Sequence, residues 1–265
     1  MEEEIKYLTN EEYQRILYDF CTLRQKIVMN LITHDLLKSQ LVMDLTAGHG
    51  FLSFALNEKG YDGKIIDIGL LNDLISFKRA IGSGKYDFHN IQYFIMDSSK
   101  IAFKDNTFDF IVNFLGLEDI NMTIGKKGVE MTLLELGRIL KKNGILEIAI
   151  MIKGNEPSSN LNWKLWKYIG LNSIFYAPEF YIKHLSSIGC QFKHKFLLKT
   201  YKKMNLEQAR EEILFACREA PKLFAKYNVT ARQFQDVWNK YAMKIKQYGL
   251  GYYPEILVLV FKKSK

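Results

Sequence analysis

Short apolar runs alternate with longer stretches of helical periodicity between residues 41 and 152, and this alternation constrains the fold more than any other feature. The apolar runs are residues 41–43, 64–66, 91–96, 110–114 and 145–152, and helical stretches cover 51–59, 71–80 and the segment up to about residue 141. Apolar strands separated by helices are typical of a parallel sheet that is covered on both faces. We therefore expect a doubly wound α/β core over residues 41–152.

The segment before this core predicts a helix over residues 9–33. Its apolar side chains recur at three- and four-residue spacing, which gives the helix one apolar face. Thr9 followed by Glu12 fits a capping box at the start of that helix. An amphipathic helix needs a surface to pack on, and we expect the α/β core to provide it.

The segment after the core predicts further strands and helices, at residues 191–201 (strand), 206–220 and 230–248 (helices) and 256–261 (strand). We expect the two late strands to pair with each other and close the sheet. Residues 202–250 would then form a helical cap inserted before the last strand. A chain of 265 residues can hold all these elements in one domain, so residues 1–265 are interpreted as a single domain.

Composition excludes several classes of protein. The chain is 48% hydrophobic and 25% charged, as in ordinary globular proteins, and no apolar run reaches the roughly 18–20 residues that span a bilayer. The acidic N-terminus has no apolar segment of the kind that a secretory signal needs. Three cysteines, Cys21, Cys190 and Cys217, are too widely spaced for a disulfide framework or a zinc knuckle. These features lead us to expect a cytoplasmic protein without a metal.

The net charge of +8 is concentrated in one segment. Residues 193–248 contain 13 Lys and Arg against 5 Asp and Glu, and the rest of the chain is neutral. Such a segment is either a set of solvated helix faces or a basic surface for RNA or an acidic substrate. The lysines are spread along the sequence and not clustered with aromatic residues that could stack on bases, which favours solvated faces.

The turn after the first apolar run is the most informative local motif. Asp44 ends that run, and a turn containing Gly48 and Gly50 leads directly into a helix. Glycines let a ligand approach the backbone closely, and the start of a helix offers unpaired N–H groups. The same kind of turn serves NAD, FAD and nucleotide-like methyl donors, and it can also be only a tight turn.

Of three further residues, Asp44 and Ser53 discriminate between these cofactors and Asp67 fits both classes. Asp67 follows the second apolar run, 23 residues after Asp44, where a carboxylate can accept hydrogen bonds from ribose hydroxyls in either class. The charge of Asp44 suits a ligand that carries an ammonium group and would repel a pyrophosphate. Ser53 stands where the dinucleotide fingerprint needs its third glycine. The sequence therefore favours a methyl donor.

Residues 41–152 resemble the class I S-adenosylmethionine (SAM)-dependent methyltransferases, close to the type-11 methyltransferase group. The matching segments, in order, are 44–50 (DLTAGHG), 67–68 (DI), 96–98 (MDS), 103–112 (FKDNTFDFIV) and 134–148, which contains RILKKNG. This resemblance implies a Rossmann-like seven-stranded sheet whose last strand is antiparallel, and residues 256–261 fit that strand.

The resemblance also implies roles for individual residues, with SAM as the cofactor. Asp44 and the turn residues Thr46, Ala47, Gly48 and Gly50 would hold the methionine moiety. Asp67 would bind the ribose hydroxyls and Ile68 would pack on the adenine, with Asp97 and Ser98 at the adenine amino group. Asn113 and Phe114 would lie beside the methyl-bearing sulfonium. Thr46 departs from the family, which often has glycine there.

The catalytic residues stay unassigned at this point. Glu118 and Asp119 follow the fourth predicted strand, on the side where ligands bind in open α/β sheets, so they are candidates to orient the acceptor or remove its proton. They fit equally well as acidic caps of the next helix. The segment 113–116 reads NFLG and lacks the Asn-Pro-Pro-aromatic signature of enzymes that methylate exocyclic base amines.

The leading functional hypothesis is methylation of a small molecule, without membrane association. Residues 154–180 and 202–250, together with the N-terminal helix, would form the acceptor pocket, with Phe175 and Tyr176 as its best aromatic candidates. Two alternatives stay open: an RNA or protein methyltransferase that uses the basic segment, and a non-catalytic SAM-binding regulatory module. The sequence names neither the acceptor atom nor the oligomeric state.

Overall fold

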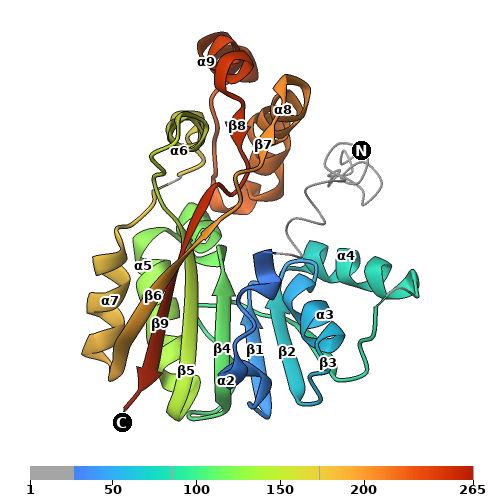
Figure 1. Cartoon of the computed structure of the whole chain (residues 1–265), viewed down its shortest axis with the longest axis vertical. Coiled ribbons are helices and arrows are strands. Elements are labelled where there is room, and N and C mark those ends of the chain that lie inside the picture. The colour runs from blue at the N-terminus through green and yellow to red at the C-terminus, as the bar shows by residue number, and fades with distance from the viewer. Residues whose placement is uncertain (1–26, 85, 173, 265) are drawn as a thin grey trace.

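A computed structural model describes residues 27–84, 86–172 and 174–264, and it is built around a seven-stranded sheet (Figure 1). The strands lie in the order β3-β2-β1-β4-β5-β9-β6. Their bounds are β1 Leu41–Leu45, β2 Lys64–Gly69, β3 Ile91–Ile95, β4 Phe108–Phe114, β5 Leu140–Met151, β6 Cys190–Lys199 and β9 Glu255–Lys263. The strands β1 to β5 pair in parallel, whereas β9 is antiparallel to both β5 and β6. The expected sheet with an antiparallel last strand is confirmed.

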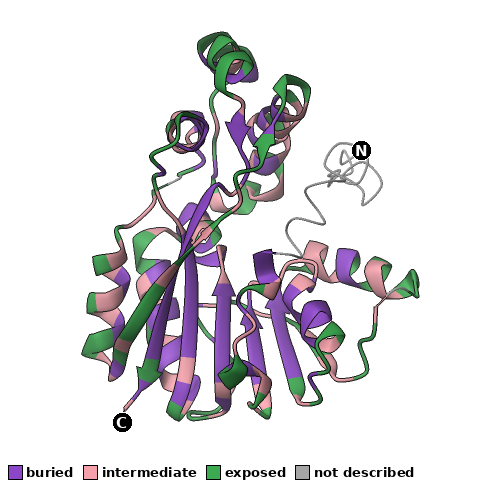
Figure 2. Ribbon diagram, viewed as in Figure 1, coloured by how far each residue is buried: buried purple, intermediate pink, exposed green. Residues whose placement is uncertain are grey.

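Helices cover both faces of this sheet, as a doubly wound fold requires. The helices are α2 His34–Leu37, α3 Phe51–Glu58, α4 Leu71–Gly82, α5 Gly116–Ile139, α6 Pro157–Ile169, α7 Pro178–Ser187, α8 Leu206–Leu223 and α9 Phe234–Tyr248, with a short 3₁₀ turn at Ala225–Tyr227. Ile148 of β5 packs in a cluster with α5 and α7, while its neighbour Ala149 packs in a cluster with α2 and α3. This alternation buries both faces of the central strands (Figure 2).

The expected N-terminal helix is described only at its end, because residues 9–26 lie outside the described part of the chain. Residues 27–29 are helical, and Ile27, Val28 and Leu31 are buried in the cluster that contains α2 and α3. The end of this segment therefore packs on the α/β core, in agreement with the sequence analysis.

The insertion before β9 and the helix α6 together form a layer above the sheet that we call the cap. It consists of α6, α8, α9 and the short strands β7 (Lys203–Met204) and β8 (Leu250–Gly251) (Figure 1). The pairing of β7 with β8 brings the two ends of residues 202–250 together. The apolar faces of α8 and α9 pack on each other and on α6, in a cluster that includes Ile213, Val237 and Met122 of α5. The cap thus builds most of its own apolar core, and α6 belongs to it.

Cations of the cap lie over aromatic rings, which contradicts the sequence-based view that the two are not clustered. The Lys240 Nζ lies 3.6 Å from the ring centroid of Tyr168, and the Arg232 Cζ lies 4.5 Å from the same centroid. Arg210 lies 5.5 Å from the ring centroid of Phe234. These pairs join residues that are far apart in sequence, so the spacing of lysines along the chain could not reveal them.

Candidate cofactor and acceptor site

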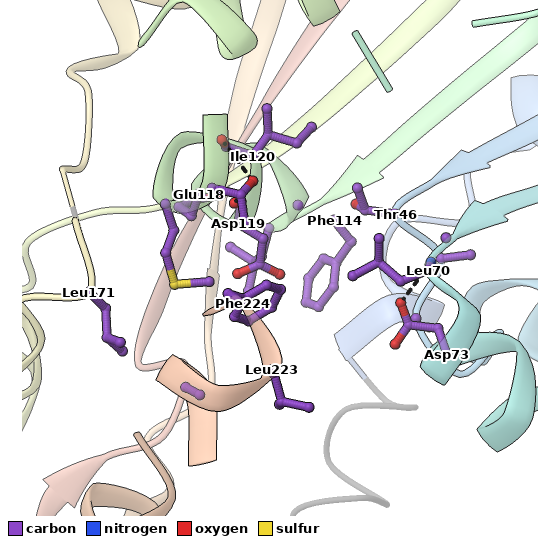
Figure 3. Close-up of a pocket in the computed structure, with 18 of the residues that line it drawn as sticks. Thr46, Leu70, Asp73, Phe114, Glu118, Asp119, Ile120, Leu171, Leu223 and Phe224 are labelled. Atoms are coloured by element: carbon purple, nitrogen blue, oxygen red, sulfur yellow. Dashed lines mark hydrogen bonds between the residues drawn. The ribbon is translucent and has the colours of Figure 1, made fainter. Parts of the chain in front are cut away.

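A cavity of about 740 Å³ lies where the carboxyl ends of the parallel strands meet the cap (Figure 3). Thr46 follows β1, Gly69 ends β2, Asp97 follows β3 and Phe114 ends β4, and all four line the cavity. Ligands of open α/β sheets bind at this edge. One end of the cavity is formed by these strand ends, which we call the cofactor half, and the other by α5 and the cap, which we call the cap half.

Two glycines shape the turn between β1 and α3. Gly50 begins α3 with φ 79°, and a Cβ added there would lie 2.7 Å from the ring of Phe77, so only glycine fits. Gly48 has φ 55°. The cavity is lined by Thr46, Ala47, Gly48 and His49, whereas Gly50 does not line it.

Asn113 holds this turn and does not line the cavity. Its Nδ2 donates to the Leu45 carbonyl at 3.0 Å and to Thr46 Oγ1 at 2.9 Å, and its side chain is fully buried. Successive side chains of a strand point to opposite faces, so Phe114 lines the cavity and Asn113 does not. The expected place of Asn113 beside the sulfonium is therefore corrected to a place beneath the turn.

Thr46 is accommodated because its neighbour is a glycine. Its hydroxyl donates to the Leu45 carbonyl, and a Cβ on Gly116 would overlap Thr46 Oγ1. Gly116 is the first residue of helix α5. Its missing side chain leaves room for Thr46, which stands where the family often has glycine.

Asp44 is a buried carboxylate in the wall of the cavity, with 3% of its surface exposed. Burial, and then the nearby Asp67 carboxylate, raise its pKa well above the ordinary value. No Lys or Arg of the described residues lowers that pKa. A ligand that brings a cation to this wall would relieve the cost of the buried charge.

Asp67 lies inside the sheet and not at its edge. The sequence analysis ended the second strand at Ile66, but β2 continues to Gly69, so Asp67 and Ile68 are both fully buried and neither lines the cavity. Asp67 Oδ1 accepts a hydrogen bond from Ser53 Oγ at 2.5 Å, and burial raises the pKa of this carboxyl to about 7. Asp67 Oδ2 has no hydrogen-bond partner among the described residues. The contacts of Asp67 with ribose and of Ile68 with adenine stay predictions.

Asp73 is the carboxylate that lines the cavity after β2, and the sequence analysis missed it. Its Oδ2 accepts a hydrogen bond from the Leu70 backbone N–H at 3.1 Å, in the first turn of α4. Asp73 stands three positions after Leu70, the N-cap residue of α4. An acidic residue at this spacing is a recognisable signal of a capping box, so Asp73 could have been found from the sequence.

Asp97 and Ser98 line the cavity where they were expected, directly after β3. Asp97 Oδ1 accepts hydrogen bonds from the backbone N–H and the hydroxyl of Ser99, both at 2.8 Å. These bonds fix the orientation of the carboxylate. Its second oxygen, Oδ2, takes no part in them.

The cap half is mainly apolar and aromatic. The aromatic residues that line it include Trp166, Phe175, Phe215, Phe224, Tyr227 and Tyr252. Phe175 lies there as expected, but Tyr176 turns away and donates a hydrogen bond to Asn121 Oδ1 at 2.8 Å. Charged residues in this half are Glu118, Asp119 and Glu212 against Lys226, so the lining is acidic although the segment 193–248 is basic.

The described residues contain no group of three or more His, Cys, Asp or Glu side chains that could hold a metal ion. No helix among them combines the length and the apolarity that crossing a membrane demands.

Comparisons with known proteins point to one family. A family model described as a methyltransferase domain matches residues 43–148. The ubiquinone/menaquinone biosynthesis C-methyltransferase UbiE of Hydrogenovibrio crunogenus is 27% identical over 118 residues, which cover 44% of this chain and 44% of that protein. The match thus spans less than half of the length of this relative.

Solved structures share the fold. A candidate methyltransferase of Bacillus halodurans superposes with a TM-score of 0.59 at 12% identity, covering 91% of this chain and 99% of that one. The YcgJ protein of Bacillus subtilis gives a TM-score of 0.61 at 11% identity, covering 92% and 99%. The matched segment, the sheet order and the turn after β1 together identify residues 43–148 as a methyltransferase domain of the class I SAM-dependent type.

Proposed function

We propose that this protein transfers a methyl group from SAM to a small-molecule acceptor held beneath the cap. The observation that carries the proposal is the cavity itself, which runs from the turn after β1 to the apolar residues of α6 and α8. Its volume of about 740 Å³ lies within the range of small-molecule sites. A single cavity would hold donor and acceptor side by side, which is the main requirement of an in-line displacement.

The cofactor half fits the parts of SAM. The buried Asp44 carboxylate would pair with the ammonium group, and the backbone of Thr46 to Gly48 would approach the methionine moiety. Asp73, which lines the cavity after β2, would accept hydrogen bonds from the ribose hydroxyls. Asp97 would accept from the adenine amino group. SAM supplies an activated methyl group on sulfur, and Phe114 would lie beside it.

The cap half supports an acceptor that is largely apolar. Its aromatic lining offers surface to a ring compound, and its three carboxylates oppose an anionic one. The Hydrogenovibrio relative is a C-methyltransferase of ubiquinone/menaquinone biosynthesis, and this supports a small-molecule acceptor.

The two alternative functions predict other features of the cap and of the cavity. An RNA methyltransferase would use exposed rings for base stacking, but Tyr168 in the cap has Lys240 and Arg232 over its ring. A regulatory module would need no room beyond its ligand, whereas this cavity continues into the cap. Both observations favour the small-molecule enzyme.

The test of this proposal follows a labelled methyl group. The purified chain is incubated with methyl-labelled SAM and, separately, with the small-molecule, RNA and protein fractions of a cell extract. Label in the small-molecule fraction is the expected result. Label in RNA or protein would identify one of the alternatives, and label in no fraction although SAM binds would favour the regulatory module.

A further inference from the structure

Two buried oxygen atoms in the wall of the cap half can only accept hydrogen bonds and have no donor among the described residues. They are Oε2 of Glu118, in the first turn of α5, and Oδ1 of Asn162, on α6. Both residues line the cavity, from its two sides. Buried polar atoms are normally hydrogen-bonded, so each unpaired oxygen calls for a donor.

The remaining polar atoms of both side chains are already engaged. Glu118 Oε1 accepts a hydrogen bond from the backbone N–H of Met151 at 3.0 Å, and Asn162 Nδ2 donates to the Gly251 carbonyl at 2.7 Å. These contacts fix which atom of each side chain is left over. In both residues the left-over atom accepts hydrogen bonds and cannot donate them.

Glu118 does not form a capping box at the start of its helix. A glutamate at this position of a capping box would bond the backbone N–H of Leu115, but that N–H donates to the Ala149 carbonyl at 3.0 Å. The carboxylate interacts with the backbone N–H of its own residue and reaches across to the end of β5. A capping box therefore does not explain its place.

We propose that Glu118 Oε2 selects an acceptor that carries a hydroxyl group on an aromatic ring. This inference rests on the proposed function, because it concerns the acceptor of the same cavity. Glu118 Oε2 requires a hydrogen-bond donor, and the aromatic lining requires a ring. The three carboxylates of the cap half disfavour a substituent with negative charge.

A hydroxyl meets these demands better than an ammonium group does. An ammonium would lie beside the cationic sulfonium of the donor, and like charges repel in a cavity of low dielectric. It also lacks the lone pair that a methyl acceptor needs. A neutral hydroxyl donates one hydrogen bond to Glu118 and keeps its lone pairs for attack or for activation of the ring.

The ionisation of Glu118 should make this selection depend on pH. Burial, and to a smaller extent the charge of Asp119, raise its pKa to about 7. Tyr181 of α7 lies close enough for Glu118 to raise the pKa of its phenol. Because Oε1 faces the Met151 N–H, a proton taken up by Glu118 resides on Oε2. Selection of a hydroxyl should therefore weaken as pH falls through 7.

Binding of two matched probes tests this proposal without the natural acceptor. 2-Naphthol carries the ring and the hydroxyl, whereas 2-methoxynaphthalene blocks the donor. The full chain is saturated with S-adenosylhomocysteine (SAH), the demethylated product of SAM, and probe affinity is measured by fluorescence at pH 6 and pH 8. At pH 8 we expect about tenfold tighter binding of 2-naphthol than of 2-methoxynaphthalene, and a smaller difference at pH 6.

Glu118→Gln separates selection from a structural role. Its amide oxygen keeps the bond from Met151, so its amide nitrogen takes the place of Oε2 and turns an acceptor into a donor. The preference for 2-naphthol should vanish at both pH values, while SAH affinity stays unchanged. Glu130→Gln, on the same helix but outside the cavity, is the matched control and should retain the wild-type preference.

Each outcome decides a different claim. Equal binding of the two probes by the wild-type chain, or an unchanged pH-dependent preference in Glu118→Gln, would overturn the selection of a hydroxyl. Failure of both probes to bind the SAH-loaded chain would overturn the aromatic acceptor. Failure of SAH itself to bind would overturn the proposed function instead.

Discussion

The two halves of the cavity are built in different ways. The cofactor half consists of short segments that directly follow β1, β2, β3 and β4, so each lining residue lies within a few positions of a strand end. The cap half combines α5, α6, α8 and the segment around Tyr252, which are distant in sequence. The first half depends on local turns, and the second depends on how separate helices assemble. Recognition of the donor and of the acceptor should therefore respond to different mutations.

The largest expected effect is on the turn of the cofactor half. Gly50→Val would force a β-branched residue into φ 79° and against the ring of Phe77, which should destabilise the fold by about 2–5 kcal/mol. Thermal unfolding and SAH binding measure the loss. Gly84→Ala is the control, because Gly84 has a similar φ of 66° with open space around it, and it should cost about 1 kcal/mol. Equal effects of the two variants would show that the close approach to Phe77 is unimportant.

The next effect concerns the buried charge of the cofactor half. Asp44→Asn should weaken SAH binding by about 10- to 100-fold, since it removes a charge-assisted bond to the ammonium group. Binding of 5′-methylthioadenosine, which lacks that group, should hardly change. Because burial raises the pKa of Asp44, wild-type affinity for SAH should fall as pH decreases through that pKa. An equal loss for both ligands would place the ammonium group elsewhere.

A substitution in the cap half should leave the donor unaffected. Ala216 of α8 lines the cavity and is 1% exposed, so Ala216→Trp would fill the space for the acceptor. We expect 2-naphthol binding to fall more than tenfold, SAH affinity to stay within twofold, and stability to drop by about 1–3 kcal/mol from overpacking. Loss of SAH binding in the folded variant would contradict the separation of the two halves.

The smallest effect should come from the charged surface of the cap. Lys199, Lys203 and Lys222 do not line the cavity and are chosen for substitution. Lys226 lines the cavity and is therefore kept. Replacing these three with glutamine should change stability by less than about 0.5 kcal/mol per site and leave SAH and 2-naphthol binding unchanged. A steep salt-dependent affinity for RNA that these substitutions abolish would revive the RNA alternative.

The difference between the halves also explains what the sequence could predict. Asp44 near the end of β1, the turn residues Thr46 to Gly48, and Asp97 and Ser98 after β3 all line the cavity, and the apolar runs that precede them are clear in the sequence. Asp67 and Asn113 do not line the cavity, for a local reason. The apolar run that ends at Ile66 hides the true end of β2, and alternation along β4 turns Asn113 beneath Thr46.

The cap half was less predictable because its contacts are tertiary. Helical periodicity located α8 and α9, yet it did not assign α6 to their cluster or place Lys240 over Tyr168. Glu118 was a candidate from its position after β4. Its bond to Met151, which distinguishes it from a helix cap, joins residues 33 apart and appears only in the structure.

The central claim is that the cofactor half holds SAM. Calorimetric titration of the full chain with SAH, and in parallel with NAD, tests it most directly. The account predicts saturable one-to-one binding of SAH and no binding of NAD, because the buried Asp44 carboxylate attracts an ammonium group and repels a pyrophosphate. A folded chain that binds NAD, or that binds neither ligand, would contradict it.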